Sequence, residues 1–359
     1  MLAFQHMSKD RKILARPAEI ELMDQIASDA VLEEACAWLR AARADAHPND
    51  DVWHLLHWWS VQKSGIQQEL RAGAYRFEAL RRVQGREQVF ELWSARDALV
   101  LKAMSLVLTR YLAPNLSRRC FHLAGTGGLK GAIREVQRRL PDHTFVFRTD
   151  VKGYYASINH ELLFEQVRRL VPDRRVLNLV WQYMERWVRN GGNYTAVHCG
   201  IALGCPLSPL MGALYLKPLD DKMAALGCCY VRYMDDWVVM SPKRWKLREA
   251  IRAVNEVMDA LRVEQHPDKT FIGRISHGFD FLGYHFSEHD LALARQTVER
   301  CAERIFRLYE QGADALRIGE YLKRWARWVK SGLEGDGEAE IGKGDDVQTL
   351  CMYQIHPRD

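Results

Sequence analysis

The stretch "CCYVRYMDDWVVM", residues 228–240, constrains the fold most, because it places two acids between two apolar runs. Residues 229–233 and 237–240 are each typical of a β-strand, since they are rich in β-branched and aromatic side chains. A short turn between such strands can hold adjacent acids at the tip of a hairpin. We therefore expect Asp235 and Asp236 at a hairpin tip, where aspartate is also common simply because it favours turns.

A third carboxylate, that of Asp150, ends the apolar stretch "TFVFRTD", which also predicts a strand. If this strand pairs beside the hairpin, three carboxylates converge, and such a cluster repels itself unless cations bind. Carboxylate oxygens suit magnesium, and two metal ions about 4 Å apart are the usual arrangement for in-line phosphoryl transfer. The pattern therefore predicts a site for two Mg²⁺ ions, with Mn²⁺ as an alternative.

Helical periodicity is found along much of the chain, and extended patterns are confined to a few stretches. We predict helices over residues 17–45, from 51 onward, and over 95–112, 129–140, 160–171, 174–189, 209–225, 244–261, 294–311 and 314–332. Residues 65–93 are expected to be irregular to extended, and 270–287 to form short extended pieces. The Gly- and acid-rich residues 336–359 are expected to be flexible.

Composition indicates a soluble globular protein: 48% of the 359 residues are hydrophobic and 27% are charged. There is no apolar run long enough for a membrane span, no signal peptide, and no paired spacing among the eight cysteines. We therefore expect a cytoplasmic, reduced protein that does not enter a membrane. Residues 102–139 and 295–330 are basic with interspersed aromatics, which indicates a polyanionic partner or, alternatively, solvated helix faces.

Four stretches in order resemble successive motifs of reverse transcriptases, of the bacterial group II intron-like or retron-like branch. They are "RTDVKGYYASINH", "GIALGCPLSPLMGALYLKPLD", "YMDD" and "HPDKTFIGRISHGFDFLGYHF". The resemblance covers about residues 15–335 and implies an α+β right-hand polymerase with an antiparallel palm sheet. It implies a helical N-terminal extension (1–60), fingers and palm (61–289), a helical thumb (290–335) and a tail (336–359).

The resemblance also implies roles for individual residues of the palm. Asp150 and Asp235 match the two metal-ligand aspartates, Asp236 matches a third carboxylate that contributes less directly, and the Val151 carbonyl completes one metal's shell. Tyr155 matches an aromatic gate that excludes a ribose 2′-hydroxyl, although a core aromatic following Tyr154 would give the same pattern. Lys269 matches a lysine that protonates or stabilises the leaving pyrophosphate, and a surface turn lysine is the alternative.

Other expected contacts lie with the nucleotide and the nucleic acid. Arg82 and Arg86 fall near the family's triphosphate-gripping residues, and Gly204 belongs to the nucleotide loop. Leu203 stands where the family usually has glutamine, so either base selection is unusual or the exchange is tolerated. The basic residues expected to follow the template–primer backbone are Lys130, Arg134, Arg138, Arg324 and Arg327.

Together these features predict an RNA-directed DNA polymerase that uses deoxynucleotides, an RNA template and a DNA or RNA primer. No nuclease-like cluster follows the thumb segment, so we expect a stand-alone enzyme. The resemblance further implies a dedicated non-coding RNA, a role in antiphage defence, and a protein partner or homo-oligomer. An RNA-dependent RNA polymerase and a non-catalytic RNA-binding module remain alternatives. Tyr155 speaks against the first, and the three retained carboxylates speak against the second.

Overall fold

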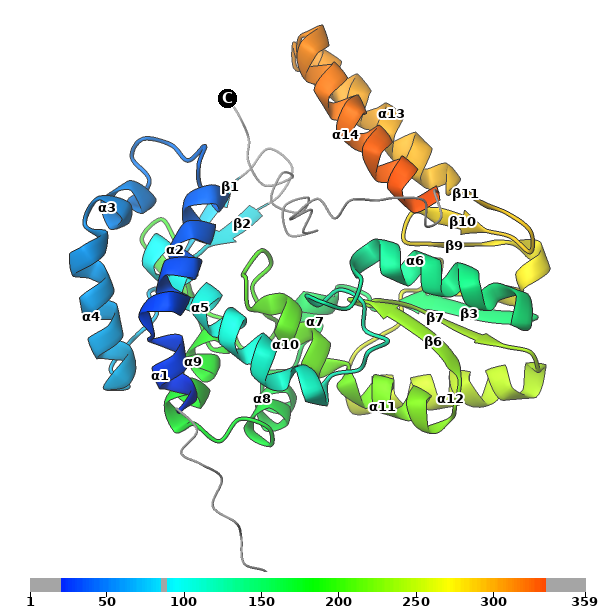
Figure 1. The fold of residues 1–359 in the computed structure, drawn as a ribbon, viewed down its shortest axis with the longest axis horizontal. Helices are drawn as coiled ribbons and strands as arrows, with labels where there is room; N and C mark the ends of the chain where they lie inside the picture. The colour runs from blue at the N-terminus through cyan, green and yellow to red at the C-terminus, as the bar shows by residue number, and fades with distance from the viewer. Residues whose placement is uncertain (1–20, 85–88, 334–359) are drawn as a thin grey trace, which may run out of the picture.

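The structure, a computed structural model, describes residues 21–84 and 89–333 (Figure 1). Its palm is a four-stranded sheet in the order β6-β7-β3-β8, and every neighbouring pair is antiparallel. The strands are β6 (Cys229–Tyr233), β7 (Asp236–Ser241), β3 (Phe145–Asp150) and β8 (Phe271–Arg274). The predicted α+β class with an antiparallel palm sheet is therefore confirmed.

Helices cover both faces of the palm sheet. Figure 1 shows α6 (Gly128–Arg139) on one side and α11 (Lys217–Ala225) and α12 (Arg244–Ala260) on the other. The central strands are consequently buried along nearly their whole length. A sheet that is buried on both faces has continuous apolar strands rather than alternating ones, which explains the uninterrupted runs on either side of Asp235.

An N-terminal helical region packs around α5 (Ala95–Leu112), whose side chains are mostly buried. Its helices are α1 (Leu22–Ile26), α2 (Asp29–Ala42), α3 (Asp51–His57) and α4 (Trp59–Arg71). The single helix expected over 17–45 is interrupted because Ser28 caps the start of α2, accepting a hydrogen bond from the Val31 amide at 3.4 Å. Helix α4 crosses residue 60, the boundary predicted between the extension and the fingers.

A second four-stranded sheet, in the order β2-β1-β4-β5, lies beside this helical region. Its strands are β1 (Leu80–Gln84), β2 (Val89–Leu92), β4 (Trp187–Asn190) and β5 (Asn193–Ala196). The helix expected over 174–189 ends at Met184, because α9 (Arg174–Met184) is followed by the β4–β5 hairpin. Val188 pairs with Leu80 of β1, so a partner about a hundred positions away in the sequence overrides the local helical pattern.

Short helices connect the palm strands. They are α7 (Tyr154–Ser157), α8 (His160–Arg168) and α10 (Ser208–Tyr215). Single 3₁₀ turns are found before and after these strands, at Ala113–Asn115, Leu140–Asp142, Pro267–Lys269 and Ile275–His277. The helix expected over 209–225 is divided at Leu216, just before Pro218 in the first turn of α11. Proline fits the first turn of a helix and disrupts a helix interior, which explains the break.

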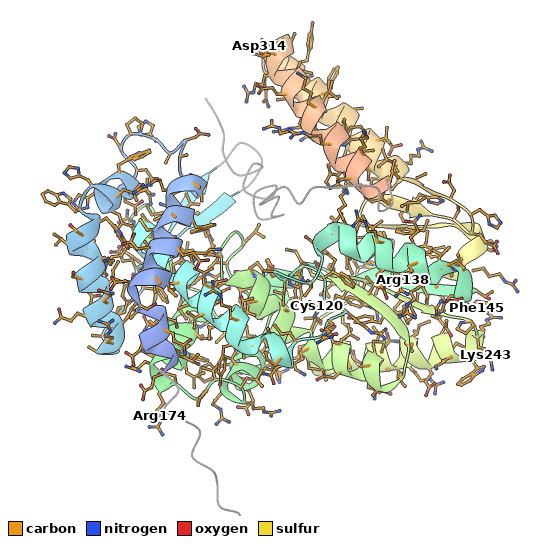
Figure 2. The ribbon with its side chains drawn as sticks, viewed as in Figure 1. Cys120, Arg138, Phe145, Arg174, Lys243 and Asp314 are labelled. Carbon is orange, nitrogen blue, oxygen red and sulfur yellow. The ribbon has the colours of Figure 1, made fainter. Side chains whose placement is uncertain are left out.

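The thumb is a helical hairpin, α13 (Arg295–Glu310) and α14 (Ala315–Leu333), close to the two helices predicted there. Figure 1 shows it projecting from a small sheet of β9 (Phe279–Phe281), β10 (Tyr284–Phe286) and β11 (Leu291–Leu293). Asp314 marks its far tip in Figure 2. Most thumb side chains are exposed, including the large Phe306, Tyr309 and Leu316.

Two bulk expectations can be compared with the described residues. Within residues 21–84 and 89–333, no helix is long and apolar enough to cross a membrane. The cysteines of these residues are free thiols, and most of them are buried: Cys36, Cys120, Cys205, Cys228 and Cys301. Buried free cysteines behave as small apolar side chains, as their scattered spacing indicated.

Candidate active site in the palm

The strand register of the palm brings the predicted carboxylates together. Asp150, the last residue of β3, lies directly opposite Asp236, the first residue of β7. Side chains of directly opposed residues project from the same face of a sheet. Asp235 occupies the turn immediately before Asp236, so all three acids lie at the same end of the palm sheet, where β3 ends and β7 begins.

Asp150 is almost completely buried. One of its carboxylate oxygens, Oδ2, accepts a hydrogen bond from the Lys269 ammonium, whose side chain is about half exposed. The other oxygen, Oδ1, is buried without a partner in the described residues. A buried carboxylate oxygen without a partner is costly, so this oxygen suits a role as a cation ligand.

Asp236 is engaged differently, because it forms a two-pronged ion pair with Arg148. The Arg148 Nε and Nη2 atoms lie 3.3 and 3.1 Å from the two Asp236 oxygens. Arg148 also donates to the Lys269 carbonyl at 3.0 Å, which connects this pair to the lysine beside Asp150. Two-pronged arginine–carboxylate contacts are among the stronger ones in proteins, so Asp236 is the least available of the three acids.

The electrostatics of Asp235 and Asp236 are those of a crowded acidic site. Burial raises the pKa of Asp235 to about 6, and the negative charge of Asp150 adds to this effect. Burial also raises the pKa of Asp236 to about 6, although Arg148 opposes the shift. Both carboxylates thus resist ionisation in the protein alone, and a cation near them would favour their charged forms.

We tested whether these residues suit the magnesium ions that the sequence predicts. Within the described ranges 21–84 and 89–333, no three His, Cys, Asp or Glu side chains form a ready-made metal cluster. The partnerless Oδ1 of Asp150 and the adjacent Asp235 nevertheless offer hard oxygen ligands. These two residues fit a divalent cation, whereas Asp236 is held by Arg148.

The pairing of Val151 indicates which way its carbonyl points. Val151 forms an isolated antiparallel bridge with Gln265. The hydrogen bonds of this bridge come from the neighbours, His266 to Asp150 at 2.9 Å and Lys152 to Glu264 at 2.9 Å. In such a widely spaced pair the residue's own carbonyl points away from the partner strand, here toward the side of β7 and the acidic turn.

The sequence did not single out the buried ion pair behind the turn. Arg232 of β6 is fully buried and binds both oxygens of the buried Asp220, with Nε 2.8 Å from Oδ1. Its Nη1 donates to the Met234 carbonyl at 2.8 Å, so this pair supports the turn that carries Asp235. An arginine inside an otherwise apolar strand is a signal that could have identified it, because buried charges are almost always paired.

In the predicted nucleotide loop, Leu203 and Gly204 are exposed, whereas the residues on either side of them are buried. Leu203 is 61% exposed, whereas Ala202 and Cys205 are buried. Gly204 has a φ of +77°, a left-handed conformation that favours glycine. The Ser208 hydroxyl anchors the segment by donating to the Ala202 carbonyl at 2.6 Å.

Tyr155 is half-buried and lies against Gly212 of α10. Its ring centroid is 5.5 Å from that of Tyr154, and a Cβ atom at Gly212 would come within 3.1 Å of the Tyr155 ring. Its backbone carbonyl accepts from the Ile201 amide at 2.7 Å, which places it beside the nucleotide loop. This position suits the predicted sugar gate, and the packing also gives the residue a structural role.

The structure gives little support to the predicted contacts between the fingers and the triphosphate. Arg82 is exposed on β1, and its Nη2 pairs with Glu91 at 3.2 Å. Arg86 lies outside the described residues. Neither observation adds support to a role in gripping the triphosphate.

The predicted template–primer residues divide into two groups. Arg134, Arg324 and Arg327 are exposed on α6 and α14, and Arg138, also exposed and labelled in Figure 2, pairs with Glu135 at 2.6 Å. Lys130 differs from the prediction, because it is directed into the base of the thumb. Its ammonium donates to the Tyr284 hydroxyl at 2.6 Å and to the Trp328 carbonyl at 2.5 Å. Lys130 therefore joins α6 to the thumb instead of facing a nucleic acid.

Comparison with known proteins gives one family match, described as "Reverse transcriptase (RNA-dependent DNA polymerase)", over residues 97–286, more than half of the chain. Protein YkfC of Escherichia coli is 24% identical over 63% of this chain and 71% of its own length. The group II intron-encoded protein LtrA of Lactococcus lactis subsp. cremoris is 20% identical over 47% of this chain and 28% of its own length. This chain thus spans most of YkfC and less than a third of LtrA.

Solved structures show weaker likenesses. A partial Cas6-RT-Cas1–Cas2 complex matches 68% of this chain and 42% of that chain at 18% identity, with a TM-score of 0.43. An apo telomerase from Candida tropicalis matches 54% of this chain and 45% of that chain at 13% identity, with a TM-score of 0.44. The assignment of the fold rests on the family match and on the palm sheet described above.

Proposed function

This chain belongs to the reverse transcriptase family, and from that premise we propose that its palm catalyses RNA-directed DNA synthesis. The observation that carries the proposal is the apposition of Asp150 and Asp236 across β3 and β7, with Asp235 in the adjoining turn. Substrates would be an RNA template, a DNA or RNA primer and deoxynucleotides. Attack of the primer 3′-hydroxyl on the α-phosphate would release pyrophosphate.

Asp150, Asp235 and the Val151 carbonyl would hold the metal ions. Two bound Mg²⁺ ions, or Mn²⁺ in their place, would supply charge stabilisation for phosphoryl transfer and a lowered pKa for the attacking hydroxyl. The partnerless Asp150 Oδ1 and the raised pKa of Asp235 support this assignment. Asp236 would act mainly by holding Arg148 and, through it, the backbone of Lys269.

Lys269 would place positive charge where the leaving group gathers negative charge. Its ammonium already contacts Asp150, and its side chain is about half exposed at the edge of the site. A positioned cation at this place stabilises a departing pyrophosphate or donates a proton to it. Tyr155, beside the nucleotide loop, would restrict the sugar to deoxyribose.

The nucleic acid would lie along the basic faces of α6 and the thumb. Exposed Arg134, Arg324 and Arg327 support that part of the proposal, which predicts binding that is independent of sequence and weakened by salt. A dedicated non-coding RNA and a role in antiphage defence are further proposals that rest on the resemblance to retron-type enzymes. A cytoplasmic location is a proposal that rests on the composition and the cysteine spacing.

Primer extension on an RNA template tests the proposal. The wild type should extend a DNA primer with dNTPs in Mg²⁺ buffer, whereas Asp235→Asn should not. A preference for NTPs would favour RNA-dependent RNA synthesis, and equal extension by Asp235→Asn would overturn the polymerase assignment. Sequencing the RNA that copurifies with the protein would test the dedicated partner, because a random sample of cellular RNA would contradict it.

A further inference from the structure

His122 is brought to the catalytic turn by a segment that extends the palm sheet. The Arg232 amide donates to the Arg119 carbonyl at 2.9 Å, and the Phe121 amide donates to the Arg232 carbonyl at 2.8 Å. Cys120, labelled near the centre of the molecule in Figure 2, thereby pairs in parallel with Arg232 of β6. His122 follows two positions later and lies beside the turn at Met234, although 112 positions separate them in sequence.

The imidazole of His122 joins two backbone segments. The Met234 amide donates to His122 Nδ1 at 3.0 Å, and His122 Nε2 lies 3.0 Å from the Pro209 carbonyl. Cys120 Sγ lies 3.3 Å from the same Nδ1, which can also accept from its S–H. Because a backbone N–H can only donate, Nδ1 must be unprotonated, and Nε2 must then carry the hydrogen that Pro209 accepts. Only the neutral imidazole with its proton on Nε2 satisfies both contacts.

The protein environment maintains this neutral form. Burial lowers the pKa of His122 to about 3, and the nearby charge of Arg232 acts in the same direction. The imidazole is therefore uncharged across the physiological range, and both of its nitrogens keep their partners.

The turn that His122 contacts contains a residue in an unfavourable backbone conformation. Met234 has a φ of +55°, in the left-handed region that residues with a side chain rarely adopt. Such conformations persist when the surroundings determine them, and they are frequent at active sites. Here His122 holds the Met234 amide and Arg232 holds the Met234 carbonyl, so both polar backbone groups of this residue are bound by side chains.

The second partner, Pro209, connects His122 to the nucleotide loop. Pro209 lies in the first turn of α10, next to Ser208. The Ser208 hydroxyl in turn donates to the Ala202 carbonyl, one residue before the exposed Leu203. A short chain of hydrogen bonds thus links the backbone beside Asp235 to the loop predicted to face the incoming nucleotide.

We propose that His122 is a positioning residue that sets the catalytic turn relative to the nucleotide loop. This proposal rests on the proposed polymerase function. His122 does not touch the reacting atoms. It acts through the Met234 peptide on Asp235, and through Pro209 on the segment that carries Leu203 and Gly204.

Two substitutions separate the two hydrogen bonds. In His122→Asn the side-chain oxygen can take the place of Nδ1 and accept from Met234, but the reach to Pro209 is lost. In His122→Gln the side-chain amide can take the place of Nε2 and donate to Pro209, but the Met234 amide loses its acceptor. His122→Phe fills the space and removes both contacts.

The two single-bond variants are expected to change different kinetic parameters, one the rate and the other the KM for dNTP. His122→Gln should lower the single-turnover rate per active site about tenfold, the effect of one misplaced buried hydrogen bond, with the KM for dNTP little changed. His122→Asn should keep the rate and raise the KM for dNTP. His122→Phe should show both effects. If all three variants unfold at lower temperature yet match the wild-type rate and KM per folded active site, His122 is only structural and the proposal fails.

A measurement that does not depend on activity separates this proposal from the proposed function. Hydrogen exchange of the Met234 amide should accelerate in His122→Gln and stay near wild type in His122→Asn. If the two variants show that pattern and the wild type has no polymerase activity, the hydrogen-bond assignment stands and the proposed function fails. If exchange at Met234 is the same in all variants, the proposed bond to Nδ1 is refuted even when the enzyme is active.

Discussion

The catalytic edge of the palm and the thumb hairpin are held in place by very different means. The central palm strands β7 and β3 each have a strand on both sides, and residues on both faces of β7, such as Trp237 and Val238, are buried. The thumb leaves large side chains in solvent, with Phe306 63% and Tyr309 73% exposed. Regions with few buried contacts open more readily than the core, so the thumb is expected to move while the palm keeps its geometry.

Lys130 connects the palm helix α6 to the base of the thumb. Its ammonium lies 4.9 Å from the ring centroid of Tyr284 and 4.4 Å from that of Trp328. Gly332 lies so close to Tyr284 that a Cβ atom there would collide with its ring. In the palm, by contrast, cations neutralise acids: Arg148 pairs with Asp236, and Arg232 with Asp220. Positive charge thus neutralises buried acids in the palm, whereas at the thumb it connects the palm helix α6 to aromatic rings of the thumb and its base.

The largest expected effect comes from breaking the palm's acidic site. Asp235→Asn should abolish polymerisation and also raise the melting temperature in metal-free buffer at neutral pH. An unfolded aspartate loses its proton near pH 3.8, whereas in the folded protein the pKa of Asp235 is about 6. The wild type therefore loses stability relative to the variant as the pH rises from about 4 to about 6.

Melting curves of both proteins at pH 4, 6 and 7.5 measure this difference. Asp236→Asn is the matched control, because it leaves Arg148 without its carboxylate and should therefore gain less stability than Asp235→Asn. A lower melting temperature for Asp235→Asn at pH 7.5 would contradict the picture of a self-repelling acidic site.

The second prediction sharpens the role of the palm in sugar selection. Tyr155→Val should raise ribonucleotide incorporation relative to deoxynucleotide incorporation by about tenfold or more, the scale of one lost steric contact. Tyr154→Phe is the control, because Tyr154 is buried and its hydroxyl only donates to the Gly212 carbonyl. It should affect stability and leave sugar choice unchanged. A wild type that already uses both sugars equally would show that Tyr155 is not a gate.

The third prediction concerns a variant that should loosen the thumb hairpin and leave the palm unchanged. Lys130→Met removes a cation from two ring faces, a contact worth about 2 kcal/mol when desolvated. Hydrogen exchange in α13 and α14 should accelerate and template–primer affinity should fall, while the single-nucleotide rate at saturating primer should hold. Arg138→Met on the same helix is the control for hydrogen exchange, because Arg138 is exposed and pairs with Glu135. It should leave exchange in α13 and α14 unchanged, even though it can weaken template–primer binding. Equal effects of the two variants on this exchange would mean that Lys130 does not anchor the thumb.

The pH dependence of the wild type provides a further check on Lys130. Burial lowers its pKa to about 8 from the ordinary 10.5. Between these two values the unfolded chain binds more protons than the folded protein, so stability rises with pH in this window. The wild type should therefore gain stability relative to Lys130→Met between pH 8 and 10.5. A loss of stability in that window would show that Lys130 is not buried at the base of the thumb.

The smallest expected effect concerns Leu203, whose exposed side chain offers only apolar contact. Leu203→Gln restores a hydrogen-bonding group at the nucleotide loop and should change fidelity or base preference about fivefold, the equivalent of roughly 1 kcal/mol. Sequencing the products made on a mixed-sequence RNA template by both proteins measures this change. Identical, faithful copies would show that leucine at this position is a neutral exchange.

The sequence predicted the palm hairpin that carries Asp235 and Asp236 and the strand that ends at Asp150. Their convergence was conditional on the pairing of these strands, which the register of β3 with β7 provides. Strand patterns are local, and the side chains of paired strands meet wherever the apolar runs are brought into register. The thumb helices were predictable for the same reason, since their helical period runs unbroken through 294–311 and 314–332.

Several contacts between distant segments could be known only from the tertiary structure. Strand pairing with β1 makes residues 187–196 a hairpin, Lys130 binds the Trp328 carbonyl in the thumb, and Met234 has His122 as a partner 112 positions away. None of these contacts has a signal in the neighbouring sequence. Periodicity reports which face of an element is buried, whereas the partner of a buried polar group depends on which distant segment the fold places against it.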